Sequence, residues 1–193
     1  DVAVNPVNSS KNPPKSPKFD AEMVESCHQA LPIHLHQYLN ARGITDAVVD
    51  EYKLGWGKFY GKSWITIPIK DEYGSFRFFK LRQDPSAGNE KITYPKSTKV
   101  NPIEAQIYGW DMLQAEKERI VICEGELDRL ALLSRNIKAI TSTHGAMTFK
   151  KEWAEMLKKI KQIYICYDND EAGKKGAERA AKIRAQREAD TSA

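Results

Sequence analysis

The 193-residue sequence contains few cysteines and no long apolar run. No stretch approaches the roughly 18 consecutive apolar residues of a membrane span, and the N-terminus lacks the apolar core of a signal peptide. Its three cysteines form no C-x-x-C pair. An odd number of cysteines, two of them inside predicted buried strands, is typical of reduced intracellular thiols rather than a disulfide framework. We therefore expect a cytoplasmic protein without membrane spans.

Neither sign of charge dominates, since 30 basic and 26 acidic side chains give a net charge of +4. The distribution is more informative than the total, because acids cluster after apolar runs while the middle region and the last helix carry Lys and Arg. Residues 1–18 are rich in Pro, Asn, Ser and Lys and have little to bury. This composition predicts a flexible linker over residues 1–18.

The following segment, residues 19–117, predicts a smaller α+β subdomain. Helical patterns are followed by an apparent hairpin, a loop-like stretch and a further helix. The expected helices are 20–30, 32–41, 46–53 and 102–118, the expected strands are 63–70 and 75–82, and the loop is 83–103.

Residues 118–193 show short apolar runs that alternate with helical stretches. Continuous β-branched runs in this arrangement indicate buried parallel strands with helices on their faces. The expected strands are 119–124, 137–142 and 162–168, and the expected helices are 126–135, 148–160 and 171–188. The fold class is therefore α/β, with a parallel sheet flanked by helices.

Acidic residues follow the first and third of these strands directly. Glu124 ends one apolar run, and Asp168 and Asp170 end another. Ligand sites in such sheets lie at the carboxyl ends of the strands, so these three side chains should converge on one edge. Crowded carboxylates repel one another unless a cation lies between them, and their hard oxygens suit Mg²⁺ or Mn²⁺.

Two neighbouring features agree with a metal site at this edge. Gly125 leaves room for a metal or phosphate beside Glu124, and Asp128 falls in the first turn of the next helix, where negative charge is favourable. The alternative interpretation is structural, because acidic residues after a strand are common helix caps.

A basic set accompanies the predicted hairpin: Arg77, Lys80, Arg82 and Lys91, with Phe76, Phe78, Phe79 and Tyr94 among them. Strand alternation predicts that Arg77 and Phe79 share one face, and that Phe76, Phe78 and Lys80 share the other. Contact with single-stranded DNA or a nucleotide and a merely solvated basic face are equally compatible with this pattern.

Three further groups have both structural and functional interpretations. His144 follows the middle strand and points either to the acidic edge or into a hydrogen-bonded turn. Lys174 and Lys175 begin a basic final helix, which is either solvated or contacts phosphates. Cys27, His28, His34 and His36 are close in sequence but match no zinc-binding spacing.

The acidic motifs also carry a resemblance to a known family. Glu124-Gly125-Glu126-Leu127-Asp128, the turn Thr143-His144-Gly145-Ala146, and Asp168-Asn169-Asp170-Glu171-Ala172-Gly173 resemble the Toprim domain of primases, topoisomerases and some nucleases. The match runs over residues 118–187 and is most similar to phage helicase-primases and bacterial replicative primases. It implies a Rossmann-like Toprim fold, with Glu124 as acid/base or metal ligand, Asp168 and Asp170 as metal ligands, and Asp128 at a further acidic position.

The preceding region resembles the N-terminal subdomain of a primase RNA-polymerase core. Its landmarks are Tyr38–Ile44, Tyr52–Trp56, Ile65–Ile69, Arg82, Lys91–Tyr94 and Ile107–Gly109. Their order favours a primase over a topoisomerase. The resemblance implies that Arg82 and Lys91 hold triphosphate or template, and we place Lys80, Tyr94, His144, Lys174 and Lys175 in the same nucleotide- and DNA-binding set.

We therefore expect a Mg²⁺-dependent DNA primase core that synthesises short RNA primers on single-stranded DNA from nucleoside triphosphates. A replicative helicase in cis or in trans is the expected partner, and the nucleoid the expected place of work during replication. The alternatives are a Toprim nuclease or topoisomerase-like enzyme and a non-catalytic single-stranded-DNA-binding module. The sequence departs from the family in lacking a Cys/His zinc module and a further acidic strand, so we expect a Toprim domain (118–193) truncated at its C-terminal end.

Overall fold

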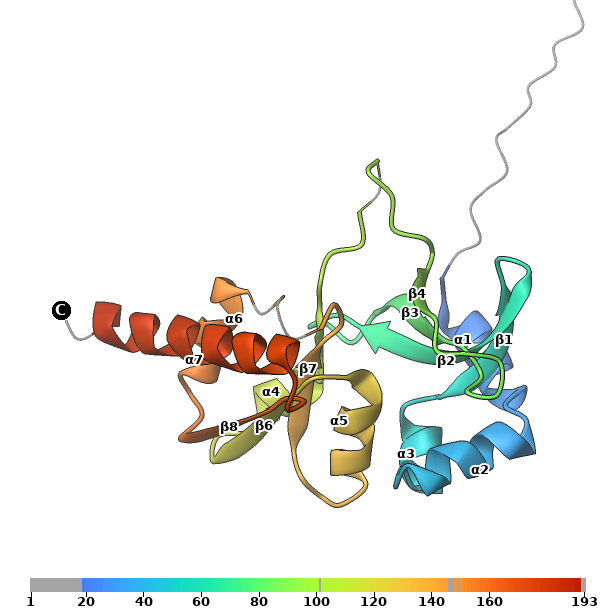
Figure 1. Ribbon diagram of the computed structural model, residues 1–193, viewed down its shortest axis with the longest axis horizontal. Helices are drawn as coiled ribbons and strands as arrows, with labels where there is room; N and C mark the ends of the chain where they lie inside the picture. Colours follow the sequence, from blue (N-terminus) through green and yellow to red (C-terminus); the bar gives the residue numbers. More distant parts are fainter. Residues whose placement is uncertain (1–18, 101, 146–147, 149, 192–193) are drawn as a thin grey trace, which may run out of the picture.

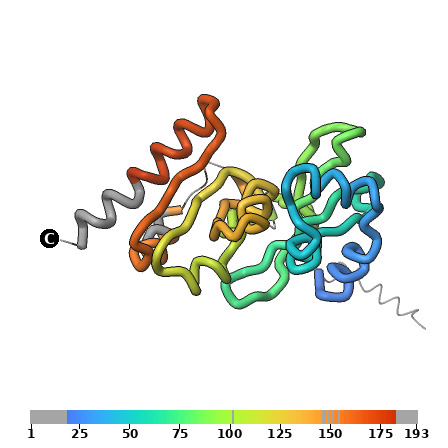
Figure 2. Tube along the Cα trace, turned by 90° about the horizontal axis from the view of Figure 1, so that it is seen from below, coloured from blue at the N-terminus to red at the C-terminus, as the bar shows by residue number. Residues whose placement is uncertain are grey.

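The computed structural model describes residues 19–100, 102–145, 148 and 150–191. An N-terminal lobe, formed by α1 to β4, and a C-terminal lobe, formed by β5 to α7, lie side by side (Figures 1 and 2). The predicted linker over residues 1–18 lies outside the described part of the chain.

Three short helices and an antiparallel sheet make up the N-terminal lobe. The elements are α1 (Ala21–Gln29), α2 (Ile33–Ala41), α3 (Asp46–Glu51), β1 (Gly55–Phe59), β2 (Lys62–Lys70), β3 (Phe76–Arg82) and β4 (Lys91–Tyr94). The four strands pair in the order β1-β2-β3-β4. The helices predicted over residues 20–30, 32–41 and 46–53 and the predicted hairpin are confirmed, whereas β1 and β4 were not predicted. Two glycines in β1 and the shortness of β4 weaken the alternation that marks a strand.

The C-terminal lobe alternates strands and helices, as predicted. Its elements are β5 (Ile107–Tyr108), α4 (Trp110–Ala115), β6 (Arg119–Cys123), α5 (Glu126–Leu133), β7 (Ala139–Ser142), α6 (Lys151–Leu157), β8 (Gln162–Cys166) and α7 (Glu171–Thr191). The strand order is β5-β7-β6-β8; β6 pairs in parallel with β7 and β8, and β5 is antiparallel to β7. The predicted α/β class with helices around a largely parallel sheet is confirmed.

The continuous helix predicted over residues 102–118 is wrong. Strand β5 occupies part of this range, and α4 begins only after Gly109. Gly109 has φ of +117°, a left-handed conformation that glycine adopts without steric cost. Such a residue cannot continue a right-handed helix, so the chain leaves β5 and turns into α4 here.

Strand β8 is an edge strand and is only half-buried, which corrects the prediction that it is buried on both faces. Ile163 and Ile165 pack into the core beneath α6 and α7, but Gln162, Tyr164 and Cys166 on the other face are exposed. Cys123, on the neighbouring strand β6, is buried as predicted. Position at the edge of the sheet, which a single apolar run does not reveal, explains the difference.

A β-bulge changes the predicted alternation of β3. The pairing shifts between Ile69 and Lys70 of β2, so that Ile69 faces Phe78 and Lys70 faces Phe76. The extra residue on β3 moves Phe76 to the face of Phe79, where both pack near α1. Phe76 and Phe78 therefore lie on opposite faces, contrary to the prediction.

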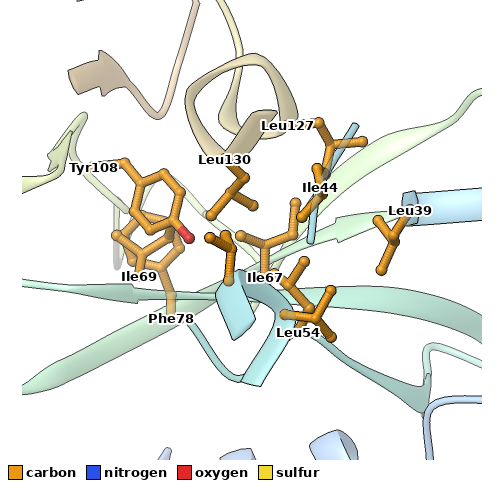
Figure 3. Close-up of a cluster of buried hydrophobic side chains, with 11 residues drawn as sticks. Leu39, Ile44, Leu54, Ile67, Ile69, Phe78, Tyr108, Leu127 and Leu130 are labelled. Atoms are coloured by element: carbon orange, nitrogen blue, oxygen red, sulfur yellow. The ribbon is translucent and has the colours of Figure 1, made fainter. Parts of the chain in front are cut away.

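A single hydrophobic cluster joins the two lobes (Figure 3). Ile67 and Ile69 of β2 pack with Leu127 and Leu130 of α5 and with Tyr108 of β5. Burying a side chain of this size stabilises a fold by about 1.5–3 kcal/mol. The core therefore crosses the predicted boundary between residues 117 and 118.

A buried arginine strengthens the same junction. Arg129 of α5 is fully buried and donates from Nε to the Ala139 carbonyl of β7 over 2.9 Å and from Nη2 to Tyr52 Oη over 3.2 Å. Its guanidinium lies 4.7 Å from the ring centre of Tyr52 and 4.4 Å from that of Tyr108. One side chain thus contacts both lobes.

Candidate functional site

The carboxyl ends of β6 and β8 lie next to each other, as the spacing of the acidic residues predicts. Cys123 and Cys166 are register partners at the ends of these parallel strands. Glu124 follows the first, and the backbone N–H of Asp168, just beyond the second, donates to Glu124 Oε2 over 2.9 Å. The Glu124 side chain thus meets the backbone of Asp168 at this edge, and the convergence of the three carboxylates stays a prediction.

Asp170 has a structural contact that the helix-cap interpretation anticipates. Its Oδ1 accepts a hydrogen bond of 2.7 Å from the backbone N–H of Gly173, in the first turn of α7. Strand β8 has already ended at Cys166, so Asp168 and Asp170 lie in a turn and not on one face of an extended strand. The strand predicted over residues 162–168 therefore ends earlier than expected, before both acids.

The turn between β8 and α7 is tightly packed. A Cβ atom at Gly173 would lie 2.0 Å from the carbonyl oxygen of Asp168, closer than any side chain allows. The missing side chain therefore lets α7 start directly against the backbone of Asp168. This close approach holds Asp168 beside Glu124.

Asp128 lies in the first turn of α5, as predicted, and also fills the space beside Gly125. A Cβ atom at Gly125 would lie 2.8 Å from Asp128 Oδ2. Asp128 Oδ1 is 3.5 Å from Nη2 of Arg42, which follows α2 in the other lobe. No local pattern in the sequence reveals this contact of Arg42, which spans 86 residues.

The donor set at this edge fits a hard divalent cation chemically. Within the described residues, Glu124, Asp168 and Asp170 each keep at least one carboxylate oxygen without a hydrogen-bond partner. In that same part of the chain, however, no group of three or more His, Cys, Asp or Glu side chains is arranged to hold a metal ion. Glu124 and Asp168 are brought together, and the full ligand set stays a prediction.

Three of the predicted basic residues share one face of the N-terminal sheet. Arg82 is the register partner of Lys91 across β3 and β4, and Lys80 lies two residues before Arg82. Because side chains alternate along a strand, these three point to the same side. Tyr94 pairs with Phe79 and packs on the opposite side, with its ring centre 4.4 Å from that of Phe59. The structure thus separates Tyr94 from the basic group.

This basic face turns toward the C-terminal lobe. Lys80 Nζ donates to the Thr143 carbonyl over 2.6 Å and lies 3.8 Å from Glu126 Oε1, in the first turn of α5. Burial raises the pKa of the Glu126 carboxyl, while Lys80, Lys91 and Arg82 act in the opposite direction. Glu126 was not among the predicted site residues, although it lies inside the motif that follows β6.

His144 lies near Lys80 in the turn after β7, and its place in the nucleotide-binding set stays a prediction. Its Nδ1 is 3.2 Å from Thr143 Oγ1. Desolvation of the ring and the nearby charges of Lys80 and Lys150 lower the pKa of His144, while a backbone hydrogen bond at Ile103 acts in the opposite direction. A neutral imidazole, able both to donate and to accept, is therefore favoured at neutral pH.

The remaining predicted groups are separate. Lys174 and Lys175 are exposed in the first turns of α7, and Lys175 pairs with Glu171 over 3.0 Å. The three histidines that are close in sequence each contact a different acid: His28 with Asp50, His34 with Asp84 and His36 with Asp46. Within the described residues, no helix is both long and apolar enough to cross a membrane.

Comparison with known proteins agrees with this geometry. The Toprim-like family model matches residues 121–193. The chain is 23% identical over 229 residues to a DNA primase of Chlamydia pneumoniae, covering 95% of this chain and 38% of that protein. It is also 33% identical over 144 residues to an uncharacterised protein of Mycoplasma genitalium, covering 72% of this chain and 64% of that one. The chain carries a Toprim domain and is related to the DNA primases.

Solved structures support the same fold. The zinc-binding and RNA-polymerase domains of the Aquifex aeolicus primase superpose with a TM-score of 0.66 at 22% identity, covering 84% of this chain and 50% of that one. The primase fragment of the bacteriophage T7 primase-helicase protein gives a TM-score of 0.60 at 23% identity, covering 75% and 58%. The chain thus spans about half the length of these primase structures.

Proposed function

We propose that this Toprim protein is a Mg²⁺-dependent DNA primase core, which synthesises short RNA primers on single-stranded DNA by nucleotidyl transfer. The observation that carries the proposal is the contact of Asp168 with Glu124 at the ends of adjacent parallel strands. The relationship to DNA primases supports the choice among Toprim activities.

Glu124 and Asp168 would hold Mg²⁺ or Mn²⁺ together with Asp170 and Asp128. A bound divalent ion supplies charge neutralisation at the phosphates and favours ionisation of an attacking 3′-hydroxyl. The chain itself contributes the Glu124 carboxylate, which already contacts the backbone of Asp168. Glu124 accepts the Asp168 N–H, which orients its carboxylate toward the end of β8.

The basic face divides into fixed and available side chains. Lys80 is bound to the Thr143 carbonyl and lies beside Glu126, so its role is to position these groups. Arg82 and Lys91 have no ion-pair or hydrogen-bond partner within the described residues, which leaves them available for phosphates of a nucleoside triphosphate or template. His144 lies near Lys80 and would donate to a phosphate oxygen as a neutral ring.

A helicase is the proposed protein partner, in cis or in trans. The T7 fragment that shares this fold comes from a primase-helicase protein, which is why we name this class of partner. The chain covers 38% of the Chlamydia pneumoniae primase, so the activity of a full-length protein is likewise part of the proposal.

The test is oligoribonucleotide synthesis on single-stranded DNA with Mg²⁺ or Mn²⁺. We expect Glu124→Gln and Asp168→Asn to abolish synthesis without lowering the melting temperature, because each keeps the shape and removes one of several crowded charges. Glu178→Gln, on the exposed surface of α7, is the matched control and should be silent. Intact synthesis in both site variants would show that the acids are structural.

A non-catalytic single-stranded-DNA-binding module is the second candidate. It is favoured by the cap that Asp170 forms on α7, since this occupies one predicted metal ligand. Binding of single-stranded DNA without synthesis by the unsubstituted chain, in either metal, would select it. Metal-dependent cleavage of the DNA would instead indicate a Toprim nuclease.

A further inference from the structure

Two cysteines end the adjacent strands directly before the acidic edge. Cys123 and Cys166 are the last residues of β6 and β8 and are register partners in these parallel strands. Glu124 follows the first cysteine, and Asp168 lies two residues after the second. Register partners in adjacent strands point to the same face of a sheet, so both thiols belong to one face at one end of this sheet.

The spacing of the two strands suits a disulfide bond. Neighbouring strands lie about 4.8 Å apart, and a disulfide joins cysteines whose Cα atoms are about 4.4–6.8 Å apart and whose Cβ vectors do not diverge. Register partners on one face meet both conditions. Cys27, the third cysteine of the chain, lies in α1 of the other lobe and is buried near Trp64 and Phe79, so it does not compete for either thiol.

The two thiols differ in their access to solvent. Cys166 is exposed, whereas Cys123 is buried. The Cys123 thiol is a weak donor, and it donates to the Ile140 carbonyl of β7 over 3.5 Å and to the Gly125 carbonyl over 3.8 Å. A small solute therefore reaches Cys166 first. Cys123 can follow after its side chain turns from β7 toward β8, which is a change of rotamer.

We propose that Cys166 and Cys123 form a reversible disulfide bond, which switches the acidic edge. The co-reactant is a low-molecular-weight disulfide such as oxidised glutathione. The Cys166 thiol loses its proton and its sulfur attacks that disulfide, whose S–S bond breaks and releases one small thiol. The Cys123 sulfur, after losing its proton, then attacks the Cys166 sulfur of the mixed disulfide and releases a second small thiol. The two protein thiols lose two electrons, which reduce the small disulfide.

The bond would change the surroundings of Glu124. Turning Cys123 toward β8 withdraws its S–H from the carbonyls of Gly125 and Ile140. Gly125 follows Glu124, whose carboxylate accepts the Asp168 N–H. A covalent link would also fix the spacing of the two strand ends at this contact. Exposed disulfides are the readily reduced, regulatory kind, so the change is reversible.

Intact-mass analysis of the 193-residue chain tests whether the bond forms. The protein is incubated with oxidised glutathione, denatured, and treated with iodoacetamide. We expect a monomer with one alkylated cysteine, and a linked pair of peptides that contain Cys123 and Cys166. Cys27→Ala is the matched control and should form the same bond. Cys123→Ser, whose hydroxyl can still donate to the Ile140 carbonyl, should stop at the glutathione adduct of Cys166.

Three outcomes contradict the bond. The first is a lasting glutathione adduct on the unsubstituted chain, and the second is a dimer linked through Cys166. The third is oxidation of Cys166→Ser to a bond between its two remaining cysteines, because Cys166 would then not be needed. None of these readouts requires primer synthesis, so failure of the bond and failure of the proposed function are distinguishable.

The effect of the bond on activity rests on the proposed function and is measured by primer synthesis. The oxidised chain should be several-fold less active, and dithiothreitol should restore it. Cys166→Ser should keep its activity through the same treatment. In a chain that makes no primers, the amide NMR signals of Gly125 and Asp168 are the readout, and they should differ between the oxidised and reduced forms. A bond that changes neither synthesis nor these signals would show that it is not a switch.

Discussion

The carboxylate of Glu126 lies 3.8 Å from the ammonium group of Lys80, and both side chains are largely buried where the two lobes meet. Burial opposes the ionised form of Glu126 more strongly than the three nearby cations favour it, so its pKa is raised. Ionising the Glu126 carboxyl in the folded protein therefore costs stability. Such a cost is common at functional sites.

Replacing Glu126 by Gln should therefore stabilise the protein at neutral pH. A raised pKa means that the folded chain binds the proton more tightly than the unfolded chain. The stability that this group contributes is fully present below pH 4.5, the ordinary pKa of a glutamate side chain. It is lost as the pH rises through the raised pKa of Glu126 in the folded protein. Glu126→Gln should match the parent protein at pH 4 and have the higher melting temperature at pH 7 to 8.

Calorimetry at both pH values checks this, with Glu178→Gln as an exposed control. A lower melting temperature of Glu126→Gln at pH 8 would mean that the pairing of Glu126 with Lys80 outweighs its burial. A difference between variant and parent that does not change with pH would show that titration of Glu126 is not its cause.

Glu116 should behave in the opposite way. Lys138, which pairs with its side chain, and the backbone N–H groups of Glu118 and Lys117 lower the pKa of Glu116 to about 2. Stability from this group is present above pH 4.5 and is lost as pH falls from 4.5 toward 2. Glu116→Gln should melt lower than the parent protein at pH 7, and the gap should narrow by pH 3.

Melting curves at pH 7, 4 and 3 measure the effect. Glu118→Gln is the matched control, since Glu118 is exposed and its partner Lys161 is also on the surface. The interpretation fails if the two variants have the same pH dependence.

Arg82→Ala and Lys91→Ala should weaken binding of single-stranded DNA and reduce its salt dependence. Each phosphate contact on a single strand contributes about 0.7 to the slope of log affinity against log salt. Fluorescence anisotropy at several salt concentrations gives this slope. Lys62→Ala is the control, because Lys62 is paired with Glu90 over 2.8 Å. Tyr94→Phe should also be silent, since Tyr94 packs on the other face. An unchanged slope in both basic variants would mean that the face with Arg82 and Lys91 is exposed to solvent and does not contact DNA phosphates.

Local patterns account for much of the fold and part of the site. Continuous apolar runs predicted β6, β7 and β8, and the acids after two of them predicted the meeting of Glu124 and Asp168. Patterns did not distinguish an edge strand from a central one, so the exposure of Cys166 was missed. Asp170 illustrates a different difficulty, because a metal ligand and a helix cap occupy the same place in a motif.

Contacts between the lobes could not be predicted, because they depend on packing and not on sequence neighbours. The contacts of Lys80 with Glu126 and of Arg42 with Asp128 depend on the packing of β2 against α5. The pattern of a single helix or strand contains no information about such a partner.

The position of Arg129 has a consequence for how the molecule opens. Moving the lobes apart would strip this guanidinium of the Tyr52 hydroxyl and of an aromatic face while it stayed inside the C-terminal lobe. Asp111 of the same lobe would remain 3.5 Å from the guanidinium, so the loss is that of a hydrogen bond to a charged group, about 1.5–3 kcal/mol. The apolar contacts between Ile67 and Leu130 would be lost as well. Opening between the lobes is therefore unfavourable. Amide protons in α3 and α5 should exchange with solvent through the same cooperative event, so the lobes form one unit of hydrogen exchange.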